Sequence, residues 1–86
     1  MSVESLLYSK ARMKILVVLI KFRELNISSI VRKTGLNHNL VNEHLEYFKN
    51  IGLVEEKNFG RIRIFRLNES EKVRLFRELI FSSEKS

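Results

Sequence analysis

The sequence predicts a mainly α-helical fold with one small β-hairpin, in the order α-α-α-β-β-α. Two observations support this prediction. Apolar residues recur at helical spacing before Gly52, whereas from Leu53 to Leu67 they alternate with a period close to two. The three glycines, at 35, 52 and 60, each stand where one pattern ends. With 86 residues, a single domain over 1–86 is expected, because two independent cores would not fit.

The first helix is predicted from Ser9 to Arg23, with Ser9 as its N-cap. Upstream, Val3, Leu6 and Leu7 add a short turn or an arm, so that the N-terminal helical region covers about 3–23. Apolar side chains occupy almost the whole circumference of this helix. Such a helix lies at the centre of a core or is shared with a partner.

A second, short helix is predicted after residues 26–28, with Asn26 or Ser28 as its cap. Gly35 suits the left-handed position at the end of this helix. Asn37 is a suitable N-cap for a third helix that runs to about Asn50. Two short helices joined by a three- or four-residue turn that contains glycine form a helix-turn-helix.

The strands of the hairpin are predicted at Leu53–Lys57 and Arg61–Leu67, joined by a turn at 58–60. A basic hairpin that follows a helix-turn-helix directly is the wing of a winged helix-turn-helix.

A last helix is predicted at about 70–83, and its apolar arc is broader than one surface contact needs. The arc either lies flat on the core of its own chain or partly meets a second copy. We favour the second interpretation, because a small domain gains most from oligomerisation. A homodimer built through the terminal helices is therefore expected. Its predicted interface residues are Leu6, Leu7, Leu75, Phe76, Leu79 and Ile80.

The composition excludes several classes of site. Without cysteine, neither a disulfide nor a thiolate metal site is possible, and His38 and His44 have no further soft ligand beside them. We therefore expect no metal, no cofactor and no enzymatic activity. The apolar run Ile15–Ile20 is too short to span a membrane, and no signal peptide is recognisable. A cytoplasmic, nucleoid-associated protein is expected.

The net charge of +6 is unevenly placed. Residues 1–36 carry seven Lys or Arg against two Glu, residues 51–67 carry four against two, and residues 37–50 carry one against two. Such a basic chain favours a polyanionic partner, nucleic acid before membrane, over a solvated surface without a partner. The residues predicted to contact phosphates or to form the wing are Arg32, Lys33, Lys57, Asn58, Gly60, Arg61 and Arg63.

The third helix has one apolar side and one polar side. A recognition helix enters the major groove with its N-terminal turns, where asparagine can bond adenine and glutamate can accept from cytosine. The candidate base-contacting residues are Asn37, His38, Asn39, Asn42 and Glu43. Asn37 equally suits a cap, and Glu43 a solvated position. His44, on the apolar side, is interpreted as a packed histidine.

From about Ser9 to Glu69 the chain resembles the winged helix-turn-helix of ArsR-type and MarR-type transcriptional regulators, especially small archaeal and archaeal-virus versions. The most specific part is HLEYFKNIGLVEE, followed by a Gly-Arg wing. The resemblance implies a homodimer that binds a pseudo-palindromic DNA duplex. It places Asn58 to Arg63 in the wing, and at the groove it places Asn37, His38, Asn39, Asn42 and Glu43. It does not extend to the Cys or His/Asp clusters of metal-sensing members.

The sequence predicts a dimeric regulator that binds double-stranded DNA at an operator. Two alternatives remain open at this stage. One is an architectural protein that binds DNA without sequence preference, for which the basic segments suffice. The other is a winged helix that contacts proteins of the transcription machinery through the acidic part of its third helix.

Overall fold

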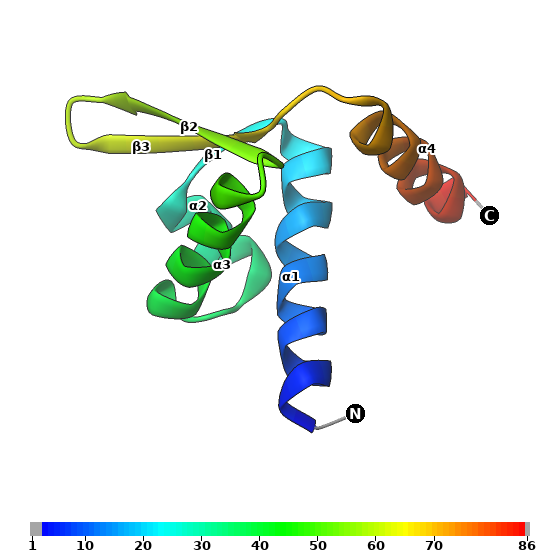
Figure 1. The fold of residues 1–86 in the computed structure, drawn as a ribbon, viewed down its shortest axis with the longest axis horizontal. Helices are drawn as coiled ribbons and strands as arrows, with labels where there is room; N and C mark the ends of the chain where they lie inside the picture. The colour runs from blue at the N-terminus through cyan, green and yellow to red at the C-terminus, as the bar shows by residue number, and fades with distance from the viewer. Residues whose placement is uncertain (1–2, 86) are drawn as a thin grey trace.

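The computed structural model describes the backbone of residues 3–85 and the side chains of residues 9–83. In this part of the chain the elements are α1 (Val3–Phe22), β1 (Glu24–Asn26), α2 (Ile27–Thr34), α3 (His38–Asn50), β2 (Val54–Phe59), β3 (Ile62–Leu67) and α4 (Glu71–Lys85). The predicted fold class, mainly α-helical with a hairpin wing, is confirmed. Figure 1 shows α1 upright, with α2 and α3 on one side and α4 on the other.

Helix α1 is continuous over 20 residues and begins at Val3, so the prediction that Ser9 caps it is wrong. Leucine and glutamate upstream of Ser9 are good helix formers, and serine inside a helix costs only about 0.5 kcal/mol. Nothing in the local sequence therefore stops the helix at residue 9. The side chains of Leu6 and Leu7 lie outside the described residues, and their place in a dimer interface stays a prediction.

A short strand that the sequence did not predict, β1, follows α1 directly. It pairs antiparallel with β3, with Leu25 opposite Phe65, so the sheet has the order β1-β3-β2. Three residues are too few to show an alternating pattern, and the pairing partner lies about 40 residues further along the chain. The strand makes β3 the centre of the sheet and ties the start of the helix-turn-helix to the wing.

The predicted caps of the helix-turn-helix are confirmed. The Oδ1 atom of Asn26 accepts a hydrogen bond from the backbone N–H of Ser29, and Oδ1 of Asn37 accepts one from Leu40, both at 2.8 Å. Gly35 has φ = 73° and closes α2 by donating its N–H to the carbonyl of Val31. These contacts set where α2 ends and where α3 begins.

The hairpin turn consists of Gly60 and Arg61, because Phe59 pairs with Ile62. The turn expected at 58–60 is thus shifted, and β2 extends two residues beyond Lys57. Gly60 has φ = 61°, and Arg61 is not among the residues with positive φ, which is the pattern of a type II′ turn. The two-residue turn keeps the strands paired to the very tip of the wing.

One apolar core joins the helices to the hairpin strands. Its side chains come from α1, α2, α3, β2, β3 and α4. Fully burying a side chain of this size stabilises a fold by about 1.5–3 kcal/mol. Because α1 meets both helices of the helix-turn-helix in this core, α3 is held as a rigid element. The members of the core that are completely buried are Ile15, Ile30, Val41, Leu45 and Phe65.

We expect Asn37→Ala to lower the free energy of unfolding by about 1 kcal/mol, because the backbone N–H of Leu40 loses its acceptor. Asn37→Asp keeps an acceptor oxygen and serves as the matched control, with a smaller effect. Urea denaturation measures both changes. An alanine variant as stable as the original chain would show that the cap does not contribute.

Candidate nucleic-acid interface

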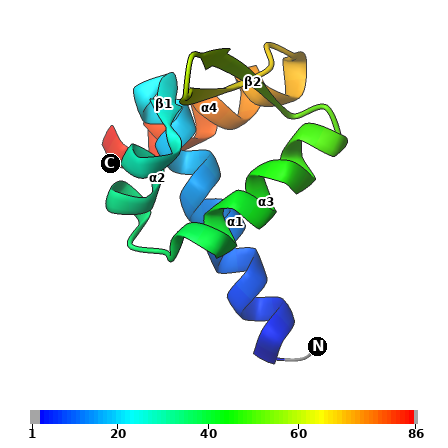
Figure 2. The same ribbon diagram turned by 90° about the vertical axis from the view of Figure 1, so that its left-hand side faces the viewer.

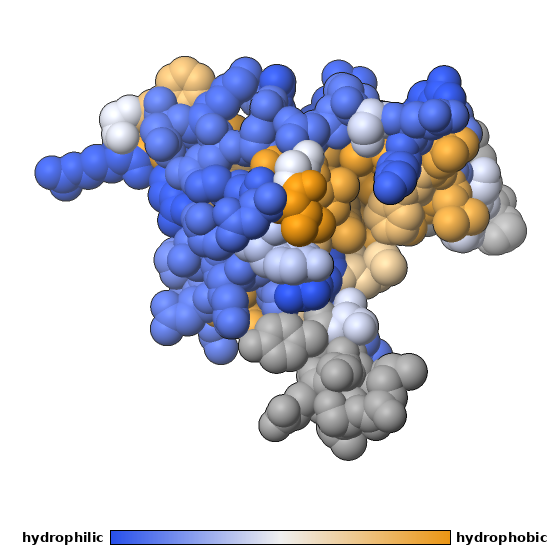
Figure 3. Space-filling view, in the orientation of Figure 1, coloured by the Kyte–Doolittle hydropathy of each residue, from blue (hydrophilic) through white to orange (hydrophobic). Residues whose placement is uncertain are grey.

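Helix α3 and the hairpin lie on the same side of the molecule. Figure 2, which faces that side, shows α3 crossing the front with the hairpin above it. Figure 3 shows mostly hydrophilic surface over these elements, with an apolar patch at the wing, and a further apolar surface between α1 and α4. The exposed apolar side chains of the wing are Phe59 and Ile62. The polar side of the recognition helix and the wing therefore form one continuous surface, which we call the polar face.

The predicted base-contacting residues occupy the start of α3 on this face. Asn37, His38, Asn39 and Glu43 are exposed, whereas Asn42 is half-buried. Asn37 faces the solvent with a side chain that already accepts the capping bond. Among these residues Asn42 is the one whose side chain reaches across to the wing.

The wing tip carries unneutralised charge. Lys57, Asn58, Gly60 and Arg61 are all exposed, and neither Lys57 nor Arg61 forms an ion pair with a described residue. Two positive charges at the end of a narrow hairpin are placed to meet a phosphate backbone or a minor groove.

Arg32 and Lys33 lie exposed in the last turn of α2, next to the turn of the helix-turn-helix. Nη2 of Arg32 donates to Oγ of Ser29 at 3.1 Å, and Nζ of Lys33 lies 3.9 Å from the ring centroid of Phe22. Both cations retain exposure to solvent, so a phosphate can still approach them.

Arg63 points away from the wing tip and back toward α3. Its Nε donates to Oε2 of Glu56 at 2.8 Å, its Nη1 to Oδ1 of Asn42 at 2.9 Å, and its Nη2 to Oε1 of Glu46 at 3.1 Å. Nζ of Lys49 completes the group, 2.7 Å from Oε1 of Glu56. We call these five residues the α3–wing cluster. Its two cations and two carboxylates balance, so the centre of α3 carries little net charge.

Burial strengthens the contacts of the α3–wing cluster. The side chain of Glu56 is only 10% exposed. Its pKa is lowered to about 2, chiefly by the hydrogen bond from Arg63 and also by the one from Lys49, against the opposing effect of burial. The same contacts raise the pKa of Lys49 and of Arg63. Glu56 therefore stays ionised over the whole physiological pH range.

The sequence did not predict the α3–wing cluster, which also contains an ion pair between Glu46 and Lys49 at 3.3 Å. The α3–wing cluster could have been predicted only from the hairpin register, which shows which residues of the two strands lie close together. Once Phe59 pairs with Ile62, Glu56 lies diagonally across the ladder from Arg63, a spacing that long side chains bridge. The prediction that Arg63 contacts phosphate stays a prediction, and the structure shows that its guanidinium is already engaged.

His44 is completely buried, in agreement with its interpretation as a packed histidine. Nε of Arg12 donates to its Nδ1 at 3.2 Å, so the imidazole is neutral with its proton on Nε2. Burial, followed by the charge of Arg12, lowers the pKa of His44. The guanidinium of Arg12 also lies 3.8 Å from the ring centroid of Tyr47, which fixes α1 against α3.

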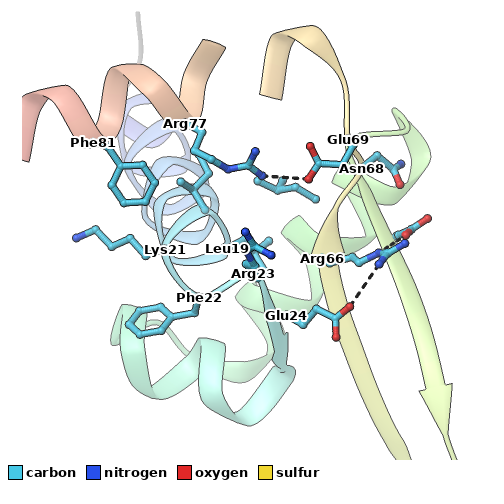
Figure 4. A pocket seen from close by; sticks show the side chains of 13 residues that line it. Leu19, Lys21, Phe22, Arg23, Glu24, Arg66, Asn68, Glu69, Arg77 and Phe81 are labelled. Carbon is cyan, nitrogen blue, oxygen red and sulfur yellow. Dashed lines mark hydrogen bonds and ion pairs between the residues drawn. The ribbon is translucent and has the colours of Figure 1, made fainter. Parts of the chain in front are cut away.

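A hollow lies between the end of α1, the sheet and α4, away from the wing tip (Figure 4). Its polar side chains largely satisfy one another. Arg77 pairs with Glu69 at 3.2 Å, and Arg66 pairs with Glu55 and with Glu24. Two further cations, Lys21 and Arg23, line the hollow beside these pairs.

Among the described residues, no three His, Asp or Glu side chains are grouped in a way that could hold a metal ion. None of the described helices is both long and apolar enough to cross a membrane.

The order of elements, the capped helix-turn-helix and the hairpin beside its second helix define a winged helix-turn-helix protein. The model of a bacterial regulatory protein family, the arsR family, matches residues 9–56. The chain belongs to the ArsR family. The predicted family resemblance is confirmed.

Solved structures support the same assignment. The transcriptional regulator HlyU from Vibrio vulnificus CMCP6 is 25% identical, with a TM-score of 0.73 over 92% of this chain and 85% of that chain. The homodimeric winged helix-turn-helix DNA-binding domain of a possible ArsR-family regulator from Mycobacterium bovis is 27% identical, with a TM-score of 0.72 over 87% and 68%.

A MarR family transcriptional regulator from Silicibacter pomeroyi DSS-3 shares the fold at 17% identity and a TM-score of 0.68, covering 88% of this chain. The chain spans 54% of the length of that regulator. No curated protein sequence matches the chain. The family and these structures are those of regulators and not of enzymes, which confirms the prediction that the chain is not an enzyme.

We expect Glu56→Gln to lower the free energy of unfolding by about 2 kcal/mol at pH 7, because Arg63 and Lys49 lose their shared carboxylate. The pKa of Glu56 is depressed in the folded chain, so its contribution is present above the ordinary carboxyl pKa of 4.5. That contribution is lost as the pH falls toward about 2. The difference between the two chains should therefore narrow from about pH 5 downward.

Chemical denaturation at several pH values measures this difference. Glu69→Gln is the matched control, because Glu69 forms an exposed pair with Arg77 that contributes little. A difference for Glu56→Gln that does not depend on pH would contradict the assignment of its cause.

Proposed function

We propose that the chain binds double-stranded DNA as a homodimer and regulates transcription in the cytoplasm by occupying an operator on the nucleoid. One observation supports this most strongly: the exposed start of α3 and the hairpin lie on the same side of the molecule, and the hairpin carries Lys57 and Arg61, which form no ion pair with a described residue. A helix that enters the major groove and a basic hairpin that follows the backbone need this arrangement.

Binding strength and base contact reside in different parts of the proposed interface. The centre of α3 is close to neutral because Glu46 is matched by Lys49 and Arg63. Phosphate attraction therefore comes from the wing tip and from Arg32 and Lys33, while the polar start of α3 meets the bases. Sequence preference is proposed on this basis, because asparagine and glutamate distinguish bases without adding phosphate affinity.

The proposed dimer uses the opposite side of the molecule. Leu75 and Leu79 on α4 are 53% and 64% exposed, and Met13 on α1 is 47% exposed. Phe76 and Ile80, also predicted at the interface, are half-buried and pack against the core of their own chain. A second copy that covers the exposed apolar surface seen between α1 and α4 in Figure 3 explains why this surface is apolar. The domain then extends over 1–86, with its terminal helices in the interface.

We expect Arg61→Ala to weaken binding to all duplexes by a similar factor and to reduce the slope of log affinity against log salt by about one unit per subunit. Arg74→Ala is the matched control, because Arg74 is an exposed arginine on α4. Fluorescence anisotropy across a salt series measures both. No binding to any duplex at low salt would contradict the proposal, and equal affinity for every sequence would favour the architectural alternative.

We expect the double variant Leu75→Glu, Leu79→Glu to sediment as a monomer with an unchanged helical circular-dichroism spectrum, because charges placed on the apolar surface prevent its burial. Ile62→Glu makes the same change at an exposed isoleucine of the wing and should leave the dimer intact. An original chain that is monomeric at micromolar concentration would rule out the proposed dimer.

A further inference from the structure

The side-chain amide of Asn42 has one chemically allowed orientation. Nη1 of Arg63 lies 2.9 Å from its Oδ1. A guanidinium has five N–H donors and no acceptor, so the atom that faces it has to be the amide oxygen. The nitrogen, Nδ2, therefore points away from Arg63. The amide oxygen and nitrogen are similar in size, and here they are told apart by the hydrogen-bond donor that faces one of them.

Arg63 is held in place by several other contacts. Glu56 accepts from its Nε and Glu46 from its Nη2, at 2.8 and 3.1 Å. The guanidinium also lies 5.1 Å from the ring centroid of Phe65, a completely buried residue. A guanidinium fixed in this way orients the Asn42 amide before any ligand arrives, so that binding loses less side-chain freedom.

The fixed amide offers donors to a ligand on the polar face. Adenine is recognised in the major groove by an asparagine whose oxygen accepts from N6 and whose nitrogen donates to N7. In this structure one of the two lone pairs of the Asn42 oxygen is already used by Arg63, whereas no described residue accepts a hydrogen bond from its Nδ2, so both N–H donors are available and the oxygen is held toward the guanidinium. The major-groove edge with two acceptors, O6 and N7, belongs to guanine.

We propose that Arg63 is a specificity-determining positioning residue, which makes Asn42 a hydrogen-bond donor that selects guanine over adenine. This inference rests on the proposed DNA binding. It replaces the adenine contact that the residue type alone suggests, and it explains why a wing arginine turns toward the helix while Arg61 faces solvent.

The first test is a selection of bound duplexes from random DNA of about 25 base pairs, enough for two half-sites one helical turn apart. The position contacted by Asn42 is the one at which Asn42→Ala loses its base preference. We expect the original chain to select guanine there by about tenfold over adenine. Replacing that guanine by 7-deazaguanine, which lacks the N7 acceptor, should weaken the original chain several-fold and leave Asn42→Ala unaffected.

The second test changes Arg63. Arg63→Met removes the donor to Oδ1, and we expect the preference at the same position to move toward adenine by about tenfold. Arg63→Lys keeps a positive charge beside Glu56, so this variant should remain folded and can be tested if the methionine variant unfolds. A single ammonium cannot occupy all three sites that Nε, Nη1 and Nη2 occupy, and the same shift is expected. Circular dichroism confirms that each variant is folded.

The outcomes are distinct. Adenine at this position in the original chain overturns the inference, and so does a guanine preference that a folded Arg63 variant retains. An Asn42→Ala variant with unchanged preference at every position, or an original chain without any preference, overturns it as well. If no duplex is bound at low salt, the proposed function itself fails.

Discussion

The hydrogen-bonded ion pair between Arg63 and Glu56 is the contact on which the geometry of the polar face depends. Glu56 is almost buried on the edge strand of the wing, β2. Its negative charge is matched by Arg63 from β3 and by Lys49 from α3. Through Arg63 the contact extends to Glu46 and Asn42 on α3. Hydrogen bonds to buried charged groups are worth more than neutral ones, and removing one partner leaves the others unsatisfied. The wing and the recognition helix therefore behave as one rigid surface.

The positive charges of the wing and of α3 fall into two groups, those that are neutralised by carboxylates of the chain and those that are not. Arg63 and Lys49 are neutralised within the chain, whereas Lys57 and Arg61 at the tip form no ion pair with a described residue. A duplex would meet phosphate-attracting charge at the wing tip and a nearly neutral, hydrogen-bonding surface at the start of α3. Affinity and base preference can then be changed separately, which is the property an operator-binding protein needs.

Much of the fold follows from local signals in the sequence. The caps of α2 and α3 form hydrogen bonds to residues within four positions along the chain, so local sequence is enough to predict where these helices begin or end. The capping residues are Asn26, Gly35 and Asn37. Features that depend on distant partners were not predicted, because single-sequence patterns carry no pairing information: β1 needs β3 some 40 residues away, and Arg63 needs Asn42 about 20 residues away. The start of α1 differs from the prediction because a serine that suits a cap is also tolerated inside a helix.

The proposed interface is most directly tested by titrating the isotope-labelled chain with a random-sequence duplex at low salt and following its backbone amide signals by NMR. We expect changes concentrated in residues 37–43 and 57–61, which diminish as salt is added, with the signals of Leu75 and Leu79 on α4 unchanged. Changes concentrated on α4, or none at any salt concentration, would contradict it.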